Sequence, residues 1–156
     1  MESQLGNLIK YEVIDSYEKS EIEDFNQFSE SSIFYIPNVE DITEITSVCA
    51  QIKNISSQMY FTPKGVSYEG QVLCGNSLII CADLKIKLKY VLCKEDKPVE
   101  SMYLNIPVST CVTLEEDFDE CLTVYPSIVI EDIFCRKLNN SKFYLSAMMI
   151  AIVDTF

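Results

Sequence analysis

The chain has 156 residues with a formal net charge of −12, and 48% of its residues are hydrophobic. These values exclude wholesale disorder and fit one domain that buries a core of its own. They argue against nucleic-acid binding, because a phosphate-binding groove needs clustered basic residues and the chain has only 12 lysines and arginines. No apolar run approaches the roughly 20 residues of a membrane span. The opening residues, MESQLGNLIKYEV, lack a signal-peptide pattern, so we expect synthesis in the cytoplasm without membrane insertion.

The N-terminal residues are polar and acidic, with scattered apolar positions. Residues 1–40 contain nine carboxylates against Lys10 and Lys19. We predict a short strand near Leu8–Ile14. We interpret residues 1–32 as an acidic arm that packs on the rest of the protein or is exchanged with a neighbour, and residues 33–156 as the β-domain.

Residues 32 to 62 predict a strand, a helix and two further strands. In residues 39–46 apolar side chains recur at three-residue spacing with acids between them, which predicts one short helix. The predicted strands are Ser32–Ile36, Val48–Ile55 and a segment around Gln58–Thr62.

The strand predicted at Ser77–Leu92 lies at the centre of the sequence, and from Ala82 on it alternates strictly. One set of side chains is apolar, whereas the other contains three lysines. A period of two over this length indicates a half-buried strand with one face in a core and one in water. The inward set is Ala82, Leu84, Ile86, Leu88, Tyr90 and Leu92, and the outward set is Asp83, Lys85, Lys87, Lys89 and Val91.

The remaining segments also read as short strands separated by turn residues. The predicted strands are Val66–Cys74, Val99–Ile106 (ended by Pro107), Ser109–Leu114, and a hairpin of Thr123–Leu138 and Lys142–Val153. Eight or nine strands with frequent turns indicate an antiparallel β-sandwich, with a barrel-like alternative, and one short helix near 39–46.

The seven cysteines show no metal-binding or redox spacing. They stand at 49, 74, 81, 93, 111, 121 and 135, and histidine is absent, so zinc-finger and thioredoxin patterns are excluded. An odd number cannot pair completely within one chain. Strand alternation places Cys81 and Cys93 with the outward lysines, and Cys49 with polar neighbours. Cys49, Cys81 and Cys93 are therefore candidates for disulfides between subunits.

Charge is segregated along the sequence. The basic stripe Lys85, Lys87 and Lys89 contrasts with a run of acids at Glu115, Glu116, Asp117, Asp119 and Glu120. A basic stripe on an acidic protein can dock the acidic patch of another copy. The alternative is a solvated strand face without a partner.

No pattern of catalytic or cofactor-binding residues is present. Nucleophilic catalysis lacks its usual base because the chain has no histidine, and no Ser-x-x-Lys arrangement occurs. The acids at 115–120 lack the Asp-x-Asp-x-Asp-Gly loop of calcium sites, and residues 70–75 lack the lysine of a phosphate-binding loop. We expect no catalytic residue, cofactor, metal or small-molecule substrate.

Four segments, taken together, resemble a known family. They are Ile36–Pro63 (IPNVEDITEITSVCAQIKNISSQMYFTP), Glu69–Ile80 (EGQVLCGNSLII), Leu84–Val91 (LKIKLKYV) and Leu104–Leu114 (LNIPVSTCVTL). Their order is similar to the SPOCS domain of clostridial spore-coat and exosporium morphogenesis proteins, over about residues 30–156. The resemblance implies a single-domain member without a LysM repeat. It also implies deposition on the spore surface, with other spore-coat proteins as partners.

Our leading hypothesis is a structural spore-surface protein that assembles with itself into a coat, exosporium or appendage layer. It would be made in the mother-cell cytoplasm, and outward thiols would later oxidise across subunit contacts. The alternative is an adaptor that tethers coat layers to the spore morphogenetic ATPase scaffold. A cytoplasmic enzyme that uses a carboxylate pair is a third, weaker option.

Overall fold

The computed structural model describes residues 9–14, 24–36, 42–73, 75–96, 98–114, 123–139 and 141–155. This part of the chain is all-β and contains no helix, which confirms the predicted fold class. Its strands are β1 (Lys10–Ile14), β2 (Asp24–Tyr35), β3 (Ile42–Phe61), β4 (Gly65–Val66), β5 (Val72–Leu73), β6 (Asn76–Leu92), β7 (Val99–Thr113), β8 (Val124–Lys137) and β9 (Lys142–Thr155).

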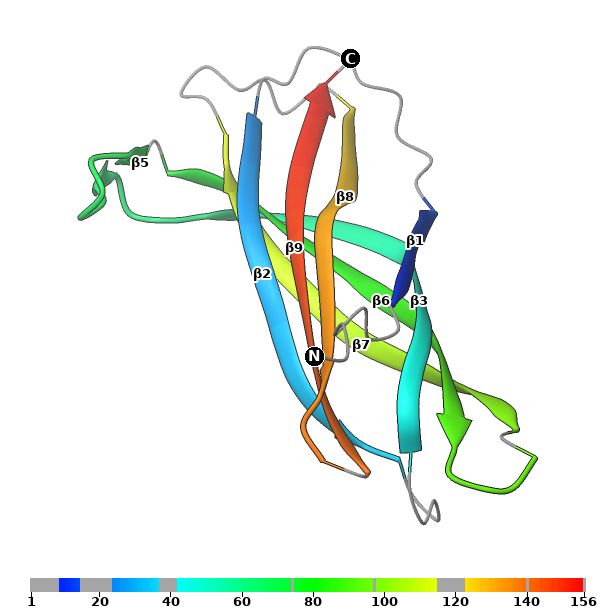
Figure 1. Ribbon diagram of the computed structural model, residues 1–156. Helices are drawn as coiled ribbons and strands as arrows, with labels where there is room; N and C mark the ends of the chain where they lie inside the picture. The colour runs from blue at the N-terminus through cyan, green and yellow to red at the C-terminus, as the bar shows by residue number, and fades with distance from the viewer. Residues whose placement is uncertain are drawn as a thin grey trace.

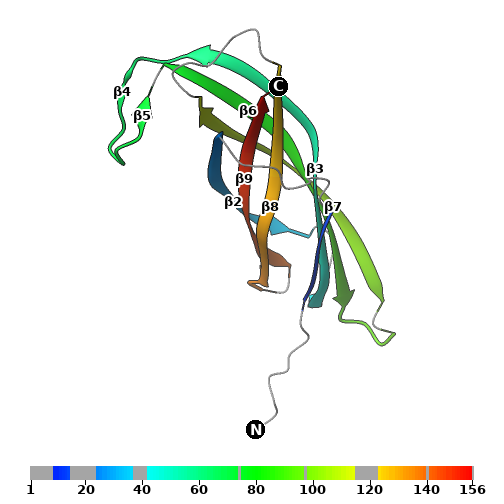
Figure 2. The same ribbon diagram turned by 90° about the horizontal axis from the view of Figure 1, so that it is seen from above.

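Two sheets pack face to face as a sandwich. Sheet A has the strand order β1-β3-β6-β7, sheet B has the order β2-β9-β8, and β4 and β5 form a small separate hairpin. The strands of the two sheets cross one another, and sheet A is the longer (Figures 1 and 2). The β4–β5 hairpin projects from one end of sheet A, and the β6–β7 turn lies at the other end (Figure 2).

The core lies between the two sheets, and the inner strands β6 and β9 contribute many of its side chains. The predicted alternation of β6 is confirmed from Ala82 to Tyr90, since Leu84, Ile86 and Leu88 are buried while Lys85 and Lys89 are exposed. It is wrong at Val91, which was predicted to point outward and is buried like both of its neighbours. On β9, alternate apolar side chains are buried against the same core; they include Phe143, Leu145, Ala147, Met149 and Ala151. Burying apolar area stabilises such a sandwich by about 25 cal/mol per Å².

The short helix predicted near residues 39–46 is wrong where the structure describes it, because β3 begins at Ile42. The register between β3 and β6 shifts between Ile42 and Glu44 and again between Ile45 and Ser47. A bulge inserts an extra residue and so reverses the alternation of faces. As a result Ile45 and Val48, three residues apart, are both buried. The bulge between Ile45 and Ser47 therefore accounts for the three-residue spacing of Ile45 and Val48, a spacing that also occurs in helices.

A further irregularity joins the two strands predicted at 48–55 and 58–62 into one. The register shifts again between Lys53 and Ser56, and Asn54 adopts a positive φ of 56°. Asparagine tolerates this conformation better than most residues with a side chain. Its amide Nδ2 also donates a 2.8 Å hydrogen bond to Asp83 Oδ2 on β6. The bulge bends β3 without ending it.

The strand predicted to end at Pro107 continues to Thr113. Pro107 lies opposite Asp83 in an unbroken ladder between β6 and β7. β7 is an end strand of sheet A, where proline is tolerated because its missing N–H need not pair with a neighbouring strand. The predicted strands 99–106 and 109–114 are therefore one strand.

The predicted boundary between an arm of residues 1–32 and the β-domain falls inside β2. This strand pairs antiparallel with β9 from Asp24 to Tyr35. β1 confirms the predicted N-terminal strand and pairs in parallel with β3. From β1, the Tyr11 hydroxyl reaches sheet B, where it accepts a hydrogen bond from Cys135 N (3.0 Å) and donates one to Cys135 O (3.3 Å).

Two hairpins complete the fold. The predicted strand Val66–Cys74 is instead the two-residue strands β4 and β5, and Cys74 itself lies outside the described residues. Gly75 follows with a φ of 94°, a conformation that side chains disfavour. The C-terminal hairpin of β8 and β9 is confirmed.

Candidate functional site: the outer face of sheet A

The face of sheet A that points away from sheet B carries three rows of cross-strand neighbours, which we call the lysine face. The middle row is Glu12, Cys49, Lys87 and Tyr103. The flanking rows are Lys10, Ser47, Lys89 and Ser101 on one side, and Ile14, Gln51, Lys85 and Asn105 on the other. These rows hold four lysines against one carboxylate, so the lysine face is locally basic on a chain of net charge −12.

A hollow of about 410 Å³ opens on the lysine face beside Cys49. Its floor and walls combine apolar and basic groups, with Lys87 Nζ lying 5.6 Å from the centroid of the Tyr103 ring. This distance suits a cation–π contact, which holds the lysine stem along the ring. The residues around the hollow include Ile14, Cys49, Lys85, Lys87, Tyr103 and Leu104.

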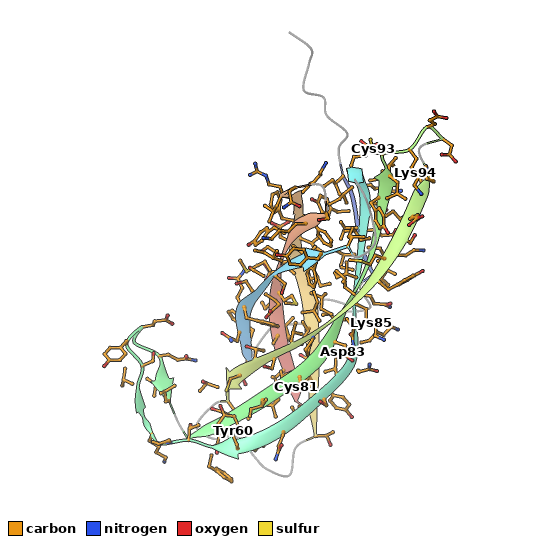
Figure 3. All side chains as sticks on the ribbon, turned by 90° about the horizontal axis from the view of Figure 1, so that it is seen from below. Tyr60, Cys81, Asp83, Lys85, Cys93 and Lys94 are labelled. Carbon is orange, nitrogen blue, oxygen red and sulfur yellow. The ribbon has the colours of Figure 1, made fainter. Side chains whose placement is uncertain are left out.

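A second, more open hollow lies farther along the same sheet, beside Cys81. It follows the bulge at Asn54 and the proline of β7, and its volume is about 550 Å³. Cys81 is exposed and lies opposite Ser109 on β7. Figure 3 labels Cys81, Asp83 and Lys85 in succession along β6, with Tyr60 near one end of sheet A and Cys93 at the other.

The three cysteines predicted to form disulfides between subunits are all at least partly exposed to solvent. Cys81 and Cys93 are exposed, Cys49 is half-buried, and all three are free thiols in the structure. Cys135 is buried instead, and this burial raises the pKa of its thiol from 9.0 to about 12. A buried thiol of this kind is chemically inert at neutral pH. Cys121 lies outside the described residues, as does Cys74.

Cys111 is a further exposed thiol that the sequence reasoning missed. It lies on the outer face of β7 opposite Ile79 of β6. Its sulfur and the Tyr60 hydroxyl form a hydrogen bond, which is the main cause of the raised pKa of Tyr60. Tyr103, Asn105 and every second residue after them point to this face of β7. Had the predicted strand been continued through Pro107, the same alternation would have placed Cys111 there.

Of the residues predicted to dock by charge, the structure describes the lysines but not the acids. Lys85, Lys87 and Lys89 lie together on the lysine face, as the alternation predicted. The acidic candidates Glu115, Glu116, Asp117, Asp119 and Glu120 lie outside the described residues. Among the residues that the structure describes, no three histidine, cysteine, aspartate or glutamate side chains gather as metal ligands do.

In the described ranges, no helix has the length and apolar character needed to cross a membrane.

The search for similar proteins found no family model, no curated protein and no solved structure that matches the chain.

Proposed function

We propose that the protein is a structural building block that assembles with copies of itself and is then cross-linked by disulfides between subunits. The observation that carries this proposal is the distribution of thiols between the two sides of the sandwich. Cys49, Cys81 and Cys111 share the outer face of sheet A, and Cys93 is exposed at its end. Free cysteine is normally among the most buried residue types. Several accessible thiols on one face favour a role in bonds to neighbours.

The strand order of the sandwich supports association between copies. β2 and β7 are end strands of their sheets, and end strands present backbone groups that can pair with another chain. β8 is the other end strand of sheet B. There the backbone N–H and C=O of Cys135 already form hydrogen bonds with the Tyr11 hydroxyl, so they are not available to another chain. Assembly through β2 or β7 therefore leaves the lysine face available for a second type of contact.

The setting we propose is a layer of the spore surface: the coat, the exosporium or an appendage. This part of the proposal rests on the resemblance of four segments to the SPOCS domain. Disulfides persist in oxidising surroundings, so cross-linking would follow release of the spore. A bond between subunits would make such a layer resistant to extraction by detergent.

The test compares the oligomeric state of the purified protein under oxidising and reducing conditions. We expect oligomers after treatment with a small-molecule disulfide, resistant to boiling detergent and dispersed by dithiothreitol. The control variant replaces Cys49, Cys81, Cys93 and Cys111 with serine, retains the buried Cys135, and should lose most of the resistant material. An oxidised wild-type protein that stays monomeric at high concentration would contradict self-assembly and favour the adaptor hypothesis.

A further inference from the structure

The lysine face has a chemical counterpart in the sequence of the same chain. Glu115–Cys121, EEDFDEC, places five carboxylates around one aromatic residue and ends in a thiol. The lysine face places four lysines around an apolar hollow and a thiol, Cys49. The segment and the lysine face therefore complement each other in charge, and each offers an apolar group and a thiol.

We propose that Glu115–Cys121 of one copy docks on the lysine face of a second copy, where Cys121 forms a disulfide with Cys49. This inference rests on the proposed self-assembly and names one of its contacts. Phe118 occupies the hollow beside Tyr103 and Ile14, and the carboxylates pair with Lys85, Lys87 and Lys89. A buried aromatic anchor surrounded by charges is a common arrangement at protein interfaces.

The length of the chain favours a second copy over the same copy as the source of the segment. Tyr103 lies on β7 in the same cross-strand row as Cys49. It is ten residues before Thr113, where β7 ends, and this separation corresponds to about 33 Å along a strand. Cys121 is seven residues beyond Leu114, so it reaches at most about 25 Å from that buried residue. Its distance from Val124, where β8 begins, is limited to about 11 Å. The row of Cys49 is therefore out of reach within one chain.

Electrostatics would guide this contact despite the net negative charge of both copies. Interactions between exposed charges are screened beyond about 8–10 Å at physiological ionic strength. At shorter range the acidic segment meets a local excess of lysines, so attraction at the contact outweighs the repulsion between distant charges. The contact should therefore weaken as salt is added.

The covalent step is a thiol–disulfide exchange that needs an oxidant of the small-molecule disulfide class. The Cys121 thiolate attacks the oxidant RSSR and releases RS⁻, which takes up the lost thiol proton to give RSH. The Cys49 thiolate then attacks the resulting mixed disulfide and releases a second RSH. The balance is two protein thiols and one RSSR, giving one protein disulfide and two RSH.

The geometry of the contact also predicts how it propagates. The acidic segment and the lysine face are formed by different residues of the chain, so the contact is heterologous. A copy that donates its segment to one neighbour still offers its own lysine face to another. Such contacts form rings or open chains, according to the rotation between copies.

The test mixes two variants that each keep one partner thiol. One retains Cys49 and the other Cys121, both retain the buried Cys135, and the remaining five cysteines in each are serine. With oxidised glutathione, we expect a reducible dimer in the mixture and at least about tenfold less in either variant alone. The Lys85→Glu/Lys89→Glu change in the Cys49 variant should slow dimer formation about tenfold. The control Lys64→Glu/Lys94→Glu adds the same charge away from the lysine face and should have little effect.

The outcomes separate this inference from the proposed function. If the mixture gives no dimer while the wild-type protein still forms reducible oligomers, the named contact is wrong and self-assembly stands. Equal dimer yields from each variant alone would also overturn the contact. An oxidised wild-type protein that remains monomeric would overturn both. Circular dichroism checks folding; if a variant is unfolded, single Cys49→Ser and Cys121→Ser changes must each remove the same cross-linked peptide from oxidised wild-type protein.

Discussion

The two faces of β6 differ in both burial and charge. Leu84, Ile86 and Leu88 are buried in the sandwich core, whereas the intervening Lys85 and Lys89 are exposed on the lysine face. Residues one position apart thus serve different purposes. The inward set stabilises the fold through burial, and in our proposal the outward set supplies charge for contacts with other copies.

This difference teaches that the fold and the proposed assembly can be altered separately. Substitutions on the inner face should unfold the protein, and substitutions on the outer face should leave the monomer intact. The same contrast applies to cysteine, because Cys135 faces the core and Cys49, Cys81 and Cys111 face outward. Three predictions test the contrast, from the largest expected effect to the smallest.

The first prediction compares neighbouring positions on β6. Leu84 is fully buried, so Leu84→Ala should lower the free energy of unfolding by about 2–5 kcal/mol through lost burial and a new cavity. Lys85→Ala, on the exposed face, should change it by less than about 0.5 kcal/mol. Urea unfolding of the reduced protein measures both. Similar losses for the two variants would show that the faces are not distinct.

The second prediction concerns the pH dependence caused by Cys135. The unfolded thiol ionises near its ordinary pKa of 9.0, but burial raises the folded pKa to about 12. Between these values the unfolded state holds fewer protons, so stability falls as pH rises, at roughly 1 kcal/mol per pH unit. Below about pH 8 the thiol is almost fully protonated in both states and contributes almost no slope.

Comparison with Cys135→Ala isolates this contribution, because the other titrating groups are retained. The difference in the free energy of unfolding between wild-type and variant should be constant below about pH 8 and should decline from there as pH rises. Measurements under reducing conditions from pH 7 to 10.5 cover the change. A difference that stays constant throughout would show that Cys135 is not buried.

The third prediction concerns the contact between Tyr11 of β1 and β8, an end strand of sheet B. Tyr11→Phe removes the hydroxyl that bonds to the backbone of Cys135, and should cost about 1 kcal/mol of stability. Tyr103→Phe is the matched control, since Tyr103 is exposed on the lysine face. Thermal unfolding of both variants provides the measurement. A Tyr11→Phe protein as stable as the control would mean that the contact adds nothing to the fold.

Strict alternation made part of the fold predictable from the sequence. β6 and the β8–β9 hairpin follow a period of two, and the structure confirms both. In β2, by contrast, polar side chains such as Asn26 and Ser32 take inward positions, and Asn26 bonds across the sandwich to Thr110. The apolar residues of β2 therefore alternate too weakly for the sequence to predict the whole strand Asp24–Tyr35.

Bulges and edge positions account for the other errors. Register shifts in β3 gave apolar residues a spacing of three and imitated a helix near Ile45. Pro107 looked like a strand end because the sequence does not reveal that β7 lies at a sheet edge. The second error also concealed Cys111. For the candidate site, alternation placed the lysines and Cys81 correctly, but it could not reveal the hollow beside Cys49, which depends on neighbours from four strands.

The most direct test of the central claim maps the disulfides of the oxidised wild-type protein. Equal amounts of ¹⁴N- and ¹⁵N-labelled protein are mixed, oxidised with glutathione disulfide and digested with a glutamate-specific protease, which places Cys49, Cys111, Cys121 and Cys135 on separate peptides. We predict cross-linked peptides of mixed isotope that contain the outward cysteines, with Cys135 left as a free thiol. Cross-links of single isotope alone, or Cys135 among the bonded residues, would contradict the account.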